Sequence, residues 1–380
     1  MYPAIIDRYL LRQYFWTALI TAIGVVGLFV IFDGFTNLEE FLRAAEKHGG
    51  LLPLLARYYA SQAVMVFDRS ASLVTLIAAM FTITWIQRHN EMTALLAAGI
   101  PRWRVILPVG VASAAIIFLA AANREIVIPQ LRDQLAQRPQ DLIGDRALPF
   151  VPRFDRQTNI LFRGRACYRE GKRIAEPNLL LPPELGKLGR QLSAQVAFYQ
   201  PAGKAHPSGY LLKGVNRPAN IAELPSVWLG DSPVIITPRD APNWLKPDEC
   251  FVVTSIDFDQ LCGGTAFRQF SSTASLIRAL RNASLDLGAD IRVTIHARIV
   301  QPLADFTLLF LGLPLVIQRE NRNVFAAIAL CTVLTAAFFV VSLGFQQLGA
   351  AYYIAPALAA WGPLMIFVPV ASVLAETIWE

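Results

Sequence analysis

The sequence NVFAAIALCTVLTAAFFVVSLGFQQLGAAYYIAPALAAWGPLMIFVPVASVLA, residues 323–375, contains no charged side chain. A helix that crosses a membrane needs about 20 consecutive, mostly apolar residues, and this stretch is more than long enough for two such helices. It therefore predicts two membrane spans, with a break near Gln346-Gln347-Leu348-Gly349.

Four more apolar runs precede this stretch. Those at residues 13–32, 70–87 and 105–123 lack charged residues, and the run at 299–318 is interrupted by Asp305 alone. We therefore predict six spans, arranged as three plus three. The first is expected to stay in the membrane, because its apolar core exceeds the roughly 7–15 residues of a cleaved signal peptide and no small-residue cleavage site follows it.

Composition and charge also indicate a membrane protein. Of the 380 residues, 54% are hydrophobic and only 16% are charged, whereas soluble domains carry roughly 25% charged residues. The formal net charge of +6 does not indicate nucleic-acid binding, because Lys and Arg do not cluster with interleaved aromatic residues. In a membrane protein the basic residues first serve orientation.

Lys and Arg in short loops predict which way the spans run. One side carries Arg8, Arg12, Arg88, Arg102, Arg104, Arg319 and Arg322. The opposite short loops carry Arg43, Lys47 and Arg57, which are offset by Glu39, Glu40 and Glu46. We therefore predict that both termini are cytoplasmic and that the long segment at about 124–295 lies outside.

The segment at about 124–295 has frequent Pro and Gly and short strand-like runs between turns. These runs lie at 159–168, 195–199, 209–215 and 250–256. Such spacing predicts an all-β domain of the sandwich or jelly-roll type, and a generic outer β domain fits the pattern as well. Residues 271–282 are predicted to form a helix capped by Ser271 or Ser272 that leads the chain back to the membrane.

The four cysteines and four histidines form no metal or catalytic motif of the CxxC, HExxH or nucleophile-elbow kind. Cys250 and Cys262 are close in sequence, and an oxidising compartment would allow them to form a disulfide, although connectivity does not follow from sequence alone. Cys331 lies within a span and is interpreted as a small packing residue. Gly186-Lys187 lacks the upstream glycine of a P-loop. We therefore expect no catalytic residues, no metal and no cofactor, and we expect any ATP hydrolysis to occur on a separate protein.

A short helix is predicted in the loop between the second and third spans, in RHNEMTALLAAGIPRWR, residues 88–104. Asn90 is a candidate cap for a helix that begins at Glu91, whose acid complements the helix N-terminus. Gly99 suits the left-handed residue that ends a helix, and Pro101 suits the first turn of the next helix.

One face of this short helix carries Glu91, Ala94, Leu95 and Ala98, at spacings of three and four residues. The face combines an acidic rim with small residues that allow close approach, which is typical of a helix that docks in a groove of another protein. A helix that merely rests on lipid headgroups is the alternative. The absence of Lys within the helix and its Ala-rich face favour docking.

Residues 90–101, NEMTALLAAGIP, resemble the coupling helix of the LptF/LptG permeases, the lipopolysaccharide-export ABC transporter family. Further segments resemble the same family in the same order along the chain: DRYL at 7–10, EIVIP at 125–129, HAR at 296–298, PL at 302–303, LGLPL at 311–315 and AAWGP at 359–363. These segments bracket nearly the whole chain, whereas the outer domain is similar only in length and strand texture.

The resemblance implies an α-helical membrane protein with six spans and an inserted periplasmic β-jelly-roll domain. Residues 1–123 would form spans one to three with the coupling helix at about 88–100, residues 124–295 the periplasmic domain, and residues 296–380 spans four to six. It also implies a multi-pass permease subunit of the bacterial inner membrane that pairs with a second related subunit over a cytoplasmic ATPase dimer. Such permeases extract lipopolysaccharide and pass it to periplasmic bridge proteins with like β domains.

Within the coupling helix, the resemblance implies that five residues contact the ATPase: Glu91, Thr93, Leu95, Ala98 and Gly99. Glu91 would meet a basic residue of the ATPase. The cavity between the paired subunits would admit acyl chains, which suits the apolar spans of this chain.

The chain departs from the family pattern near the outer ends of spans one and two. Family members often carry Lys or Arg after span one, whereas here Asp33 and other acids precede the first cation, Arg43. Span two has Asp68-Arg69 in place of the usual proline-containing apolar turn. We hypothesise that Arg43 and Arg69 replace the missing cations and contact lipid phosphates through charge-assisted hydrogen bonds. Ordinary interfacial anchoring is the alternative.

Asp305 in span four also departs from the pattern, and an ionisable residue inside a membrane is a functional candidate by default. Asp305 and Arg298 are therefore candidate substrate contacts, and a self-contained pair of Asp305 with Arg298 or with another helix is the alternative. The departures leave the cargo as lipopolysaccharide or a related lipid.

A non-transporting membrane scaffold or sensor, whose outer β domain binds a ligand or partner, is the second functional hypothesis. A membrane-embedded enzyme ranks lower, because the spans contain no paired acids or His cluster.

Overall fold

The computed structural model describes residues 5–46, 50–142, 147–203, 206–285, 287–317 and 324–379. The chain folds as two compact units, a helical unit of Met1–Leu135 with Gly288–Glu380 and a β unit of Ala136–Leu287. The borders predicted after residue 123 and before residue 296 fall inside helices, because span three runs past the first and span four begins before the second. Lys47, Arg319 and Arg322, which entered the orientation prediction, lie outside the described residues.

Six helices of the described helical unit are long and apolar enough to cross a membrane, which confirms the predicted spans. They are α1 (Ile5–Thr36), α3 (Leu51–Arg88), α5 (Arg102–Ala122), α11 (Gly288–Ile317), α12 (Val324–Ala350) and α13 (Pro356–Trp379). Beyond α5 the third span continues as a π-helix, η1 (Asn123–Val127), and then as α6 (Ile128–Gln130). The break between α12 and α13 begins directly after the predicted stretch at residues 346–349, because α12 continues through both glutamines and ends at Ala350.

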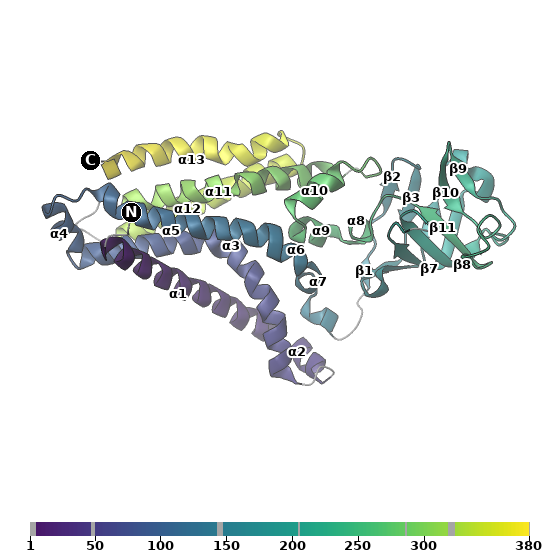
Figure 1. Ribbon diagram of the computed structural model, residues 1–380, viewed down its shortest axis with the longest axis horizontal. Coiled ribbons are helices and arrows are strands. Elements are labelled where there is room, and N and C mark those ends of the chain that lie inside the picture. The colour runs from purple at the N-terminus through teal and green to yellow at the C-terminus, as the bar shows by residue number, and fades with distance from the viewer. Residues whose placement is uncertain are drawn as a thin grey trace. The chain divides into compact units, whose positions relative to one another are not determined.

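The two ends of the helical unit carry different short elements (Figure 1). At one end α4 (Glu91–Ala97) joins α3 to α5, and both chain termini lie near this end. At the other end α2 (Leu38–Ala45) joins α1 to α3, and α7 (Arg132–Leu135) follows the third span. The termini and α4 therefore share one end of the bundle, as the six-span topology requires.

The two halves of the helical unit pack against each other along α3 and α11. Gly312 of α11 allows a close approach, because a Cβ atom at this position would collide with the side chain of Leu76 on α3. Lipid tails are as apolar as these side chains, so close packing rather than hydrophobic burial stabilises such a contact in a membrane. The buried cluster at this interface includes Val74, Ala78, Ile83, Val109, Leu309 and Leu313.

Helices α1 and α12 are the least buried of the six candidate spans. Large apolar side chains are exposed along both, among them Trp16, Ile23, Phe32, Val333 and Val340. In a membrane these two surfaces contact either lipid tails or another membrane protein.

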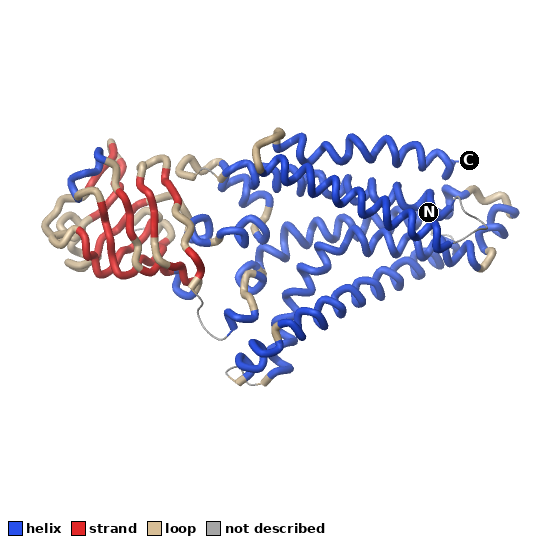
Figure 2. The backbone as a smooth tube through the Cα atoms, turned by 180° about the vertical axis from the view of Figure 1, so that it is seen from behind, coloured by secondary structure: helices blue, strands red, loops and turns tan. Residues whose placement is uncertain are grey.

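The strand pairs of the β unit are all antiparallel within the described residues, and Figure 2 shows the strands gathered in one part of the chain. The strand order is β1-β4-β5-β7-β8-β11-β10-β9, and β6, β3 and β2 branch from it at β7. The strands are β1 (Leu148–Pro149), β2 (Arg153–Asp155), β3 (Ile160–Arg163), β4 (Ala166–Tyr168), β5 (Arg173–Ala175), β6 (Asn178–Leu180), β7 (Gln191–Gln200), β8 (Gly209–Arg217), β9 (Val227–Leu229), β10 (Ser232–Ile236) and β11 (Glu249–Val253). An all-β domain inserted between membrane helices is therefore confirmed.

The strand-like runs of the sequence overlap observed strands. Those at 195–199, 209–215 and 250–256 overlap β7, β8 and β11. The run at 159–168 is divided between β3 and β4, because the chain turns between them. Short 3-10 turns lie at Pro139–Leu142, Glu170–Lys172 and Pro183–Leu188.

Three short helices follow the last strand: α8 (Phe258–Cys262), α9 (Gly264–Phe270) and α10 (Thr273–Leu280). α8 begins with a capping box, in which the side chains of Asp257 and Gln260 each accept a hydrogen bond from a backbone N–H of the other's position. Ser272 caps α10 by accepting a hydrogen bond from the Ser275 N–H at 3.2 Å. The helix predicted within 271–282 and its serine cap are thus confirmed.

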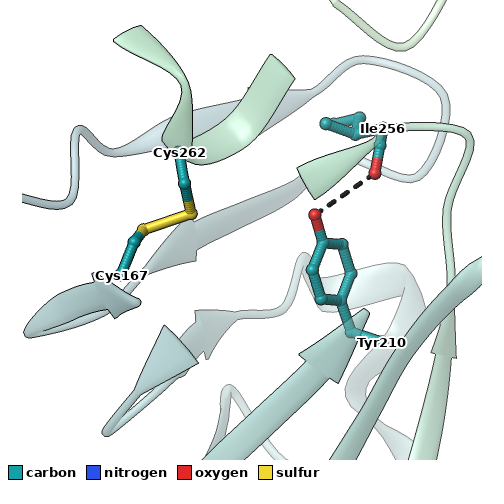
Figure 3. The surroundings of a disulfide bond; sticks show 4 residues. All are labelled: Cys167, Tyr210, Ile256 and Cys262. Carbon is teal, nitrogen blue, oxygen red and sulfur yellow. Dashed lines mark hydrogen bonds between the residues drawn. A yellow bond between two sulfur atoms is a disulfide. The ribbon is translucent and has the colours of Figure 1, made fainter. Parts of the chain in front are cut away.

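A disulfide joins Cys167 of β4 to Cys262 of α8 (Figure 3). The pairing of Cys250 with Cys262 that the sequence suggested is wrong, because the fold brings β4, 95 residues away in sequence, beside α8. Cys250 is a buried free thiol, and burial raises the pKa of this thiol, which makes it unreactive. Beside the disulfide, the Tyr210 hydroxyl donates a hydrogen bond of 3.3 Å to the Ile256 carbonyl oxygen and ties β8 to the segment before α8.

Loss of the disulfide is expected to destabilise the β unit. The bridge closes a 95-residue loop, and removal of a native disulfide from a small domain typically costs about 2–5 kcal/mol. Limited proteolysis of the purified full-length protein should therefore cut the β unit faster in Cys167→Ser and in Cys262→Ser. Cys331→Ala, in a membrane helix, is the matched control and should leave the digestion of the β unit unchanged. Equal protease resistance of the wild type with and without reductant would contradict a stabilising role.

Candidate functional site: the α4 end and the membrane pocket

The connection between α3 and α5 is built around α4. Asn90 precedes it with a left-handed φ of 59°, and its side chain forms no capping hydrogen bond, so the predicted side-chain cap is wrong. The Asn90 carbonyl oxygen instead accepts a hydrogen bond from the Ala94 N–H at 3.2 Å. Gly99 has a φ of 81°, which confirms the left-handed residue expected after the helix. Pro101 lies directly before α5, one residue earlier than predicted.

An apolar cluster fastens α4 to the ends of three spans. It contains one buried residue from each element: Leu10 of α1, Ile86 of α3, Met92 of α4 and Val105 of α5. The half-buried side chains of Leu95 and Leu96 pack against the same cluster. Because close-packed side chains transmit displacement, a force on α4 acts on α1, α3 and α5 together.

Two polar contacts hold the start of α1 at this end. The Tyr9 hydroxyl donates a hydrogen bond of 3.2 Å to Oε1 of Glu91. The Arg104 guanidinium donates two hydrogen bonds of 2.8 Å to the two carboxylate oxygens of Asp7, and such bidentate pairs are strong and directional. Asp7 and Tyr9 both belong to the segment DRYL, which therefore positions α4 and the first turn of α5.

The accessible surface of α4 consists mainly of small side chains. Thr93, Ala98 and Gly99 are exposed, and Glu91 is half-exposed at the start of the helix. Leu95 is half-buried and packs toward the spans. Of the five residues that the resemblance implies as ATPase contacts, four therefore present accessible surface and Leu95 mainly anchors the helix.

An apolar pocket of about 720 Å³ lies between α1, α3 and the end of the third span. Its size falls within the range of roughly 300–1,000 Å³ that is usual for ligand sites. A smaller groove of about 410 Å³ lies between α11 and α13. The walls of the larger pocket include Ile23, Val26, Val64, Phe67, Leu119 and Ile126, with Asn123 as a polar lining residue.

None of the five residues expected to contact lipid lines this pocket. Arg43 forms an ion pair with Glu39 on the surface of α2. Asp33 of α1 accepts a hydrogen bond of 3.0 Å from the Tyr59 hydroxyl, which joins α1 to α3. Arg69 is exposed on α3.

Asp305 is buried within the helical unit. Its Oδ1 accepts a hydrogen bond of 2.6 Å from Ser72 Oγ on α3 and another of 2.7 Å from Gln301 Nε2 on its own helix. Of the two pairings considered for Asp305, a contact with another helix is therefore the one observed. Arg298 lies about two turns earlier on α11 and is half-buried. No three His, Cys, Asp or Glu side chains are grouped to hold a metal in the part of the chain that the structure describes.

Residues 8–166 and 254–377 match the model of a protein family described as lipopolysaccharide export system permease LptF/LptG. The matched residues include nearly all of the six spans. They also include α4 and the four buried residues of its apolar cluster. The chain belongs to the LptF/LptG family. It is thus a multi-pass membrane permease of lipopolysaccharide export, as the resemblance of its motifs indicated. No curated protein matches the chain.

Sequence reasoning missed an ion pair between α3 and the third span of this permease. Arg124 Nε donates to both carboxylate oxygens of Asp68, at 3.1 and 3.2 Å. The signal was present: Asp68 comes just before the apolar run at 70–87, and Arg124 comes just after the run at 105–123. Consecutive spans run in opposite directions, so these opposite charges meet at the same end of neighbouring helices.

Proposed function

We propose that this permease is a membrane subunit of an ABC transporter. It pairs with a second related permease subunit over a dimer of a cytoplasmic ATPase and extracts lipopolysaccharide, or a related lipid, from the inner membrane. It then passes the lipid to periplasmic bridge proteins with like β domains. The observation that carries this proposal is α4, a short helix with an accessible acid and small side chains that is fastened to the ends of three spans.

In this proposal α4 occupies a groove of the ATPase. The Glu91 carboxylate meets a basic side chain there, and Thr93, Ala98 and Gly99 allow the two backbones to come close. Leu95 anchors α4 to the apolar cluster from within. Movement of the ATPase during its nucleotide cycle then shifts the ends of α1, α3 and α5 as one body, since all three meet at Met92.

The disulfide supports the orientation that the Lys/Arg distribution predicts. Disulfides persist in oxidising compartments and are rare in the cytosol. The β unit, which carries the bridge between Cys167 and Cys262, is therefore assigned to the periplasm. Three spans precede this unit and three follow it, so α4 and both termini are assigned to the cytoplasm.

The lipid path begins at the pocket between α1, α3 and the third span. Its apolar walls suit an acyl chain, and the exposed α1 and α12 are the surfaces that the second permease subunit would enclose. We assign Arg43 and Arg69 to the lipid phosphates, because both cations are exposed, Arg43 on α2 in the α1–α3 connection and Arg69 on α3. The side chains of Arg43 and its partner Glu39 are both exposed. Such surface ion pairs contribute little stability, so a lipid phosphate can replace Glu39 as the partner of Arg43.

Reversal of the charge on Glu91 is expected to weaken association with the ATPase. A charge-assisted hydrogen bond contributes about 1.5–3 kcal/mol, so its loss lowers affinity by roughly tenfold or more. The ATPase that co-purifies from solubilised membranes should fall accordingly in Glu91→Lys. Glu91→Gln keeps an oxygen for the Tyr9 hydroxyl and should retain more. Glu46→Lys, an exposed acid after α2, is the matched control and should have no effect. Normal co-purification and normal export in Glu91→Lys would rule out this role for α4.

Cysteine labelling in intact cells tests the orientation. A membrane-impermeant maleimide should modify Trp228→Cys on β9 from the periplasm. It should modify Ala98→Cys, directly after α4, only after the inner membrane has been opened. The native free thiols, Cys250 and Cys331, are buried and give little background. Labelling of the α4 position alone in intact cells would show the opposite orientation.

Site-specific photo-crosslinkers locate the lipid. A crosslinker in place of Ile23, in the pocket wall, should capture lipopolysaccharide in native membranes, and so should crosslinkers at Arg43 and Arg69. Val373, exposed on α13, is the matched position outside the proposed path and should capture little. Capture at Ile23 without capture at either arginine would assign these cations to interfacial anchoring instead. Absence of lipopolysaccharide at all of these positions would count against the lipid path.

A further inference from the structure

One face of α3 carries a row of residues spaced by four, namely Val64, Asp68, Ser72 and Leu76, which lie above one another on a helix. This row is termed the α3 stripe. Each member of the stripe makes a specific contact with another helix. The first two members contact the end of the third span, and the last two contact α11.

The first two members of the stripe hold η1, the π-helical end of the third span. Asn123 Nδ2 donates a hydrogen bond of 3.1 Å to the Val64 carbonyl oxygen. The neighbouring Arg124 forms the ion pair with Asp68 described above, and both side chains are largely buried, at 19% and 12% exposure. Consecutive residues of an α-helix point about 100° apart, and the wider π-turn helps both Asn123 and Arg124 reach the same helix. Such π-turns are rare and frequently mark functional sites.

The last two members of the stripe hold α11. Ser72 Oγ donates to Asp305 at 2.6 Å, and Gln301 one turn away donates to the same oxygen at 2.7 Å. One turn further along α3, Leu76 fills the space left by the missing side chain of Gly312. Polar groups inside a bilayer have no water to replace a lost partner, so these contacts fix the position of α11 on α3 firmly.

The two partners of the stripe have a special place in the chain. η1 lies in the last turns of the third span before the chain leaves for the β unit, and α11 is the span into which the chain returns. The α3 stripe therefore contacts both helical segments between which the β unit is inserted in the chain. Asn123 and Val64 also line the apolar pocket, so the same row forms part of the wall of the proposed lipid path.

We propose that Asp68, Ser72, Arg124 and Asp305 are positioning residues for lipid transfer, which hold the outgoing and the returning segment of the β unit on the α3 stripe. Lipid that has entered the pocket then moves on to the β unit only while both segments keep this spacing. The inference rests on the proposed export function and adds to it the residues that separate extraction from transfer. Asp305 acts in this role through its hydrogen bonds and not by touching the lipid.

The test follows lipopolysaccharide at two positions of the full-length protein in native membranes, with its partners present. One photo-crosslinker replaces Ile23 in the pocket wall, and the other replaces Tyr199 in β7. We expect Asp68→Arg and Arg124→Asp each to keep capture at Ile23 within about twofold and to lower capture at Tyr199 by about tenfold or more, since displacement of a positioned group by about 1 Å can cost 10²-fold in rate. The double variant with both exchanges restores the ion pair with reversed charges and should recover capture at Tyr199.

A second pair of variants addresses the α11 contact and protects the test against simple misfolding. Asp305→Asn keeps the Oδ1 acceptor for Ser72 and Gln301 and should transfer lipid nearly as the wild type does. Asp305→Leu removes the acceptor and should lose capture at Tyr199. Arg165→Ala, which removes an exposed ion pair with Glu176 in the β unit, is the matched control and should change neither capture.

The outcomes separate this inference from the proposed function. Wild-type capture at both positions, together with unchanged capture at Tyr199 in the Asp68, Arg124 and Asp305→Leu variants, would overturn the inference alone. Equal losses at Ile23 and Tyr199, with no recovery in the exchanged double variant, would also overturn it, because general destabilisation would then explain the losses. Wild-type capture at Ile23 without capture at Tyr199 would overturn this inference alone. A wild-type protein that captures no lipopolysaccharide at either position would overturn the proposed export function and this inference with it.

Discussion

A hydrogen bond inside the membrane, from Ser72 of α3 to Asp305 of α11 at 2.6 Å, fixes how the two halves of this permease fit together. A carboxyl group in a bilayer must find its partners in the protein, because no water is available to replace them. Gln301 donates from the same helix as Asp305, whereas Ser72 of α3 supplies its hydrogen bond only in one register of the two helices. The close contact between Gly312 and Leu76 requires the same register. The positions of the remaining spans then follow from packing on α3 and α11, since each half of the bundle contains one of these two helices.

The α4 end is held by a different kind of interaction. Its apolar cluster, centred on Met92, has little directional preference of its own, and direction comes from the bidentate pair between Asp7 and Arg104 and from the Tyr9–Glu91 contact. The Tyr9–Glu91 contact is exposed, whereas the Asp7 carboxylate is largely buried, at 13% exposure. The result is a firmly packed helix with an accessible surface of small side chains.

Much of the architecture could be predicted from local patterns, because a membrane span has a length and an apolar content that can be read directly. The six spans, the left-handed Gly99 and the helix capped by Ser272 are of this kind. The misses depend on contacts between distant segments. Cys250 and Cys262 are close in sequence and suggest a bridge, whereas the fold brings Cys167 of β4 to Cys262. The Asp68–Arg124 pair joins two consecutive spans, so it can be predicted only when their antiparallel arrangement is taken into account. Asn90 looks like a side-chain cap, yet its left-handed backbone turns the side chain away from that role.

The extent of the family match fits the same physical distinction. The match includes residues 8–166 and 254–377 and leaves out 167–253, which hold most of the long strands of the β unit. A sheet needs alternation of inward and outward side chains, and many sequences satisfy that requirement. The contact of α3 with α11 needs a residue without a side chain at Gly312 and hydrogen-bonding partners for Asp305. The structure of the helical unit therefore restricts which residues are allowed at given positions more than the structure of the β unit does. The disulfide joins Cys167, just past the first matched segment, to Cys262 inside the second. It therefore ties the unmatched strands to α8, close to the point where the match resumes.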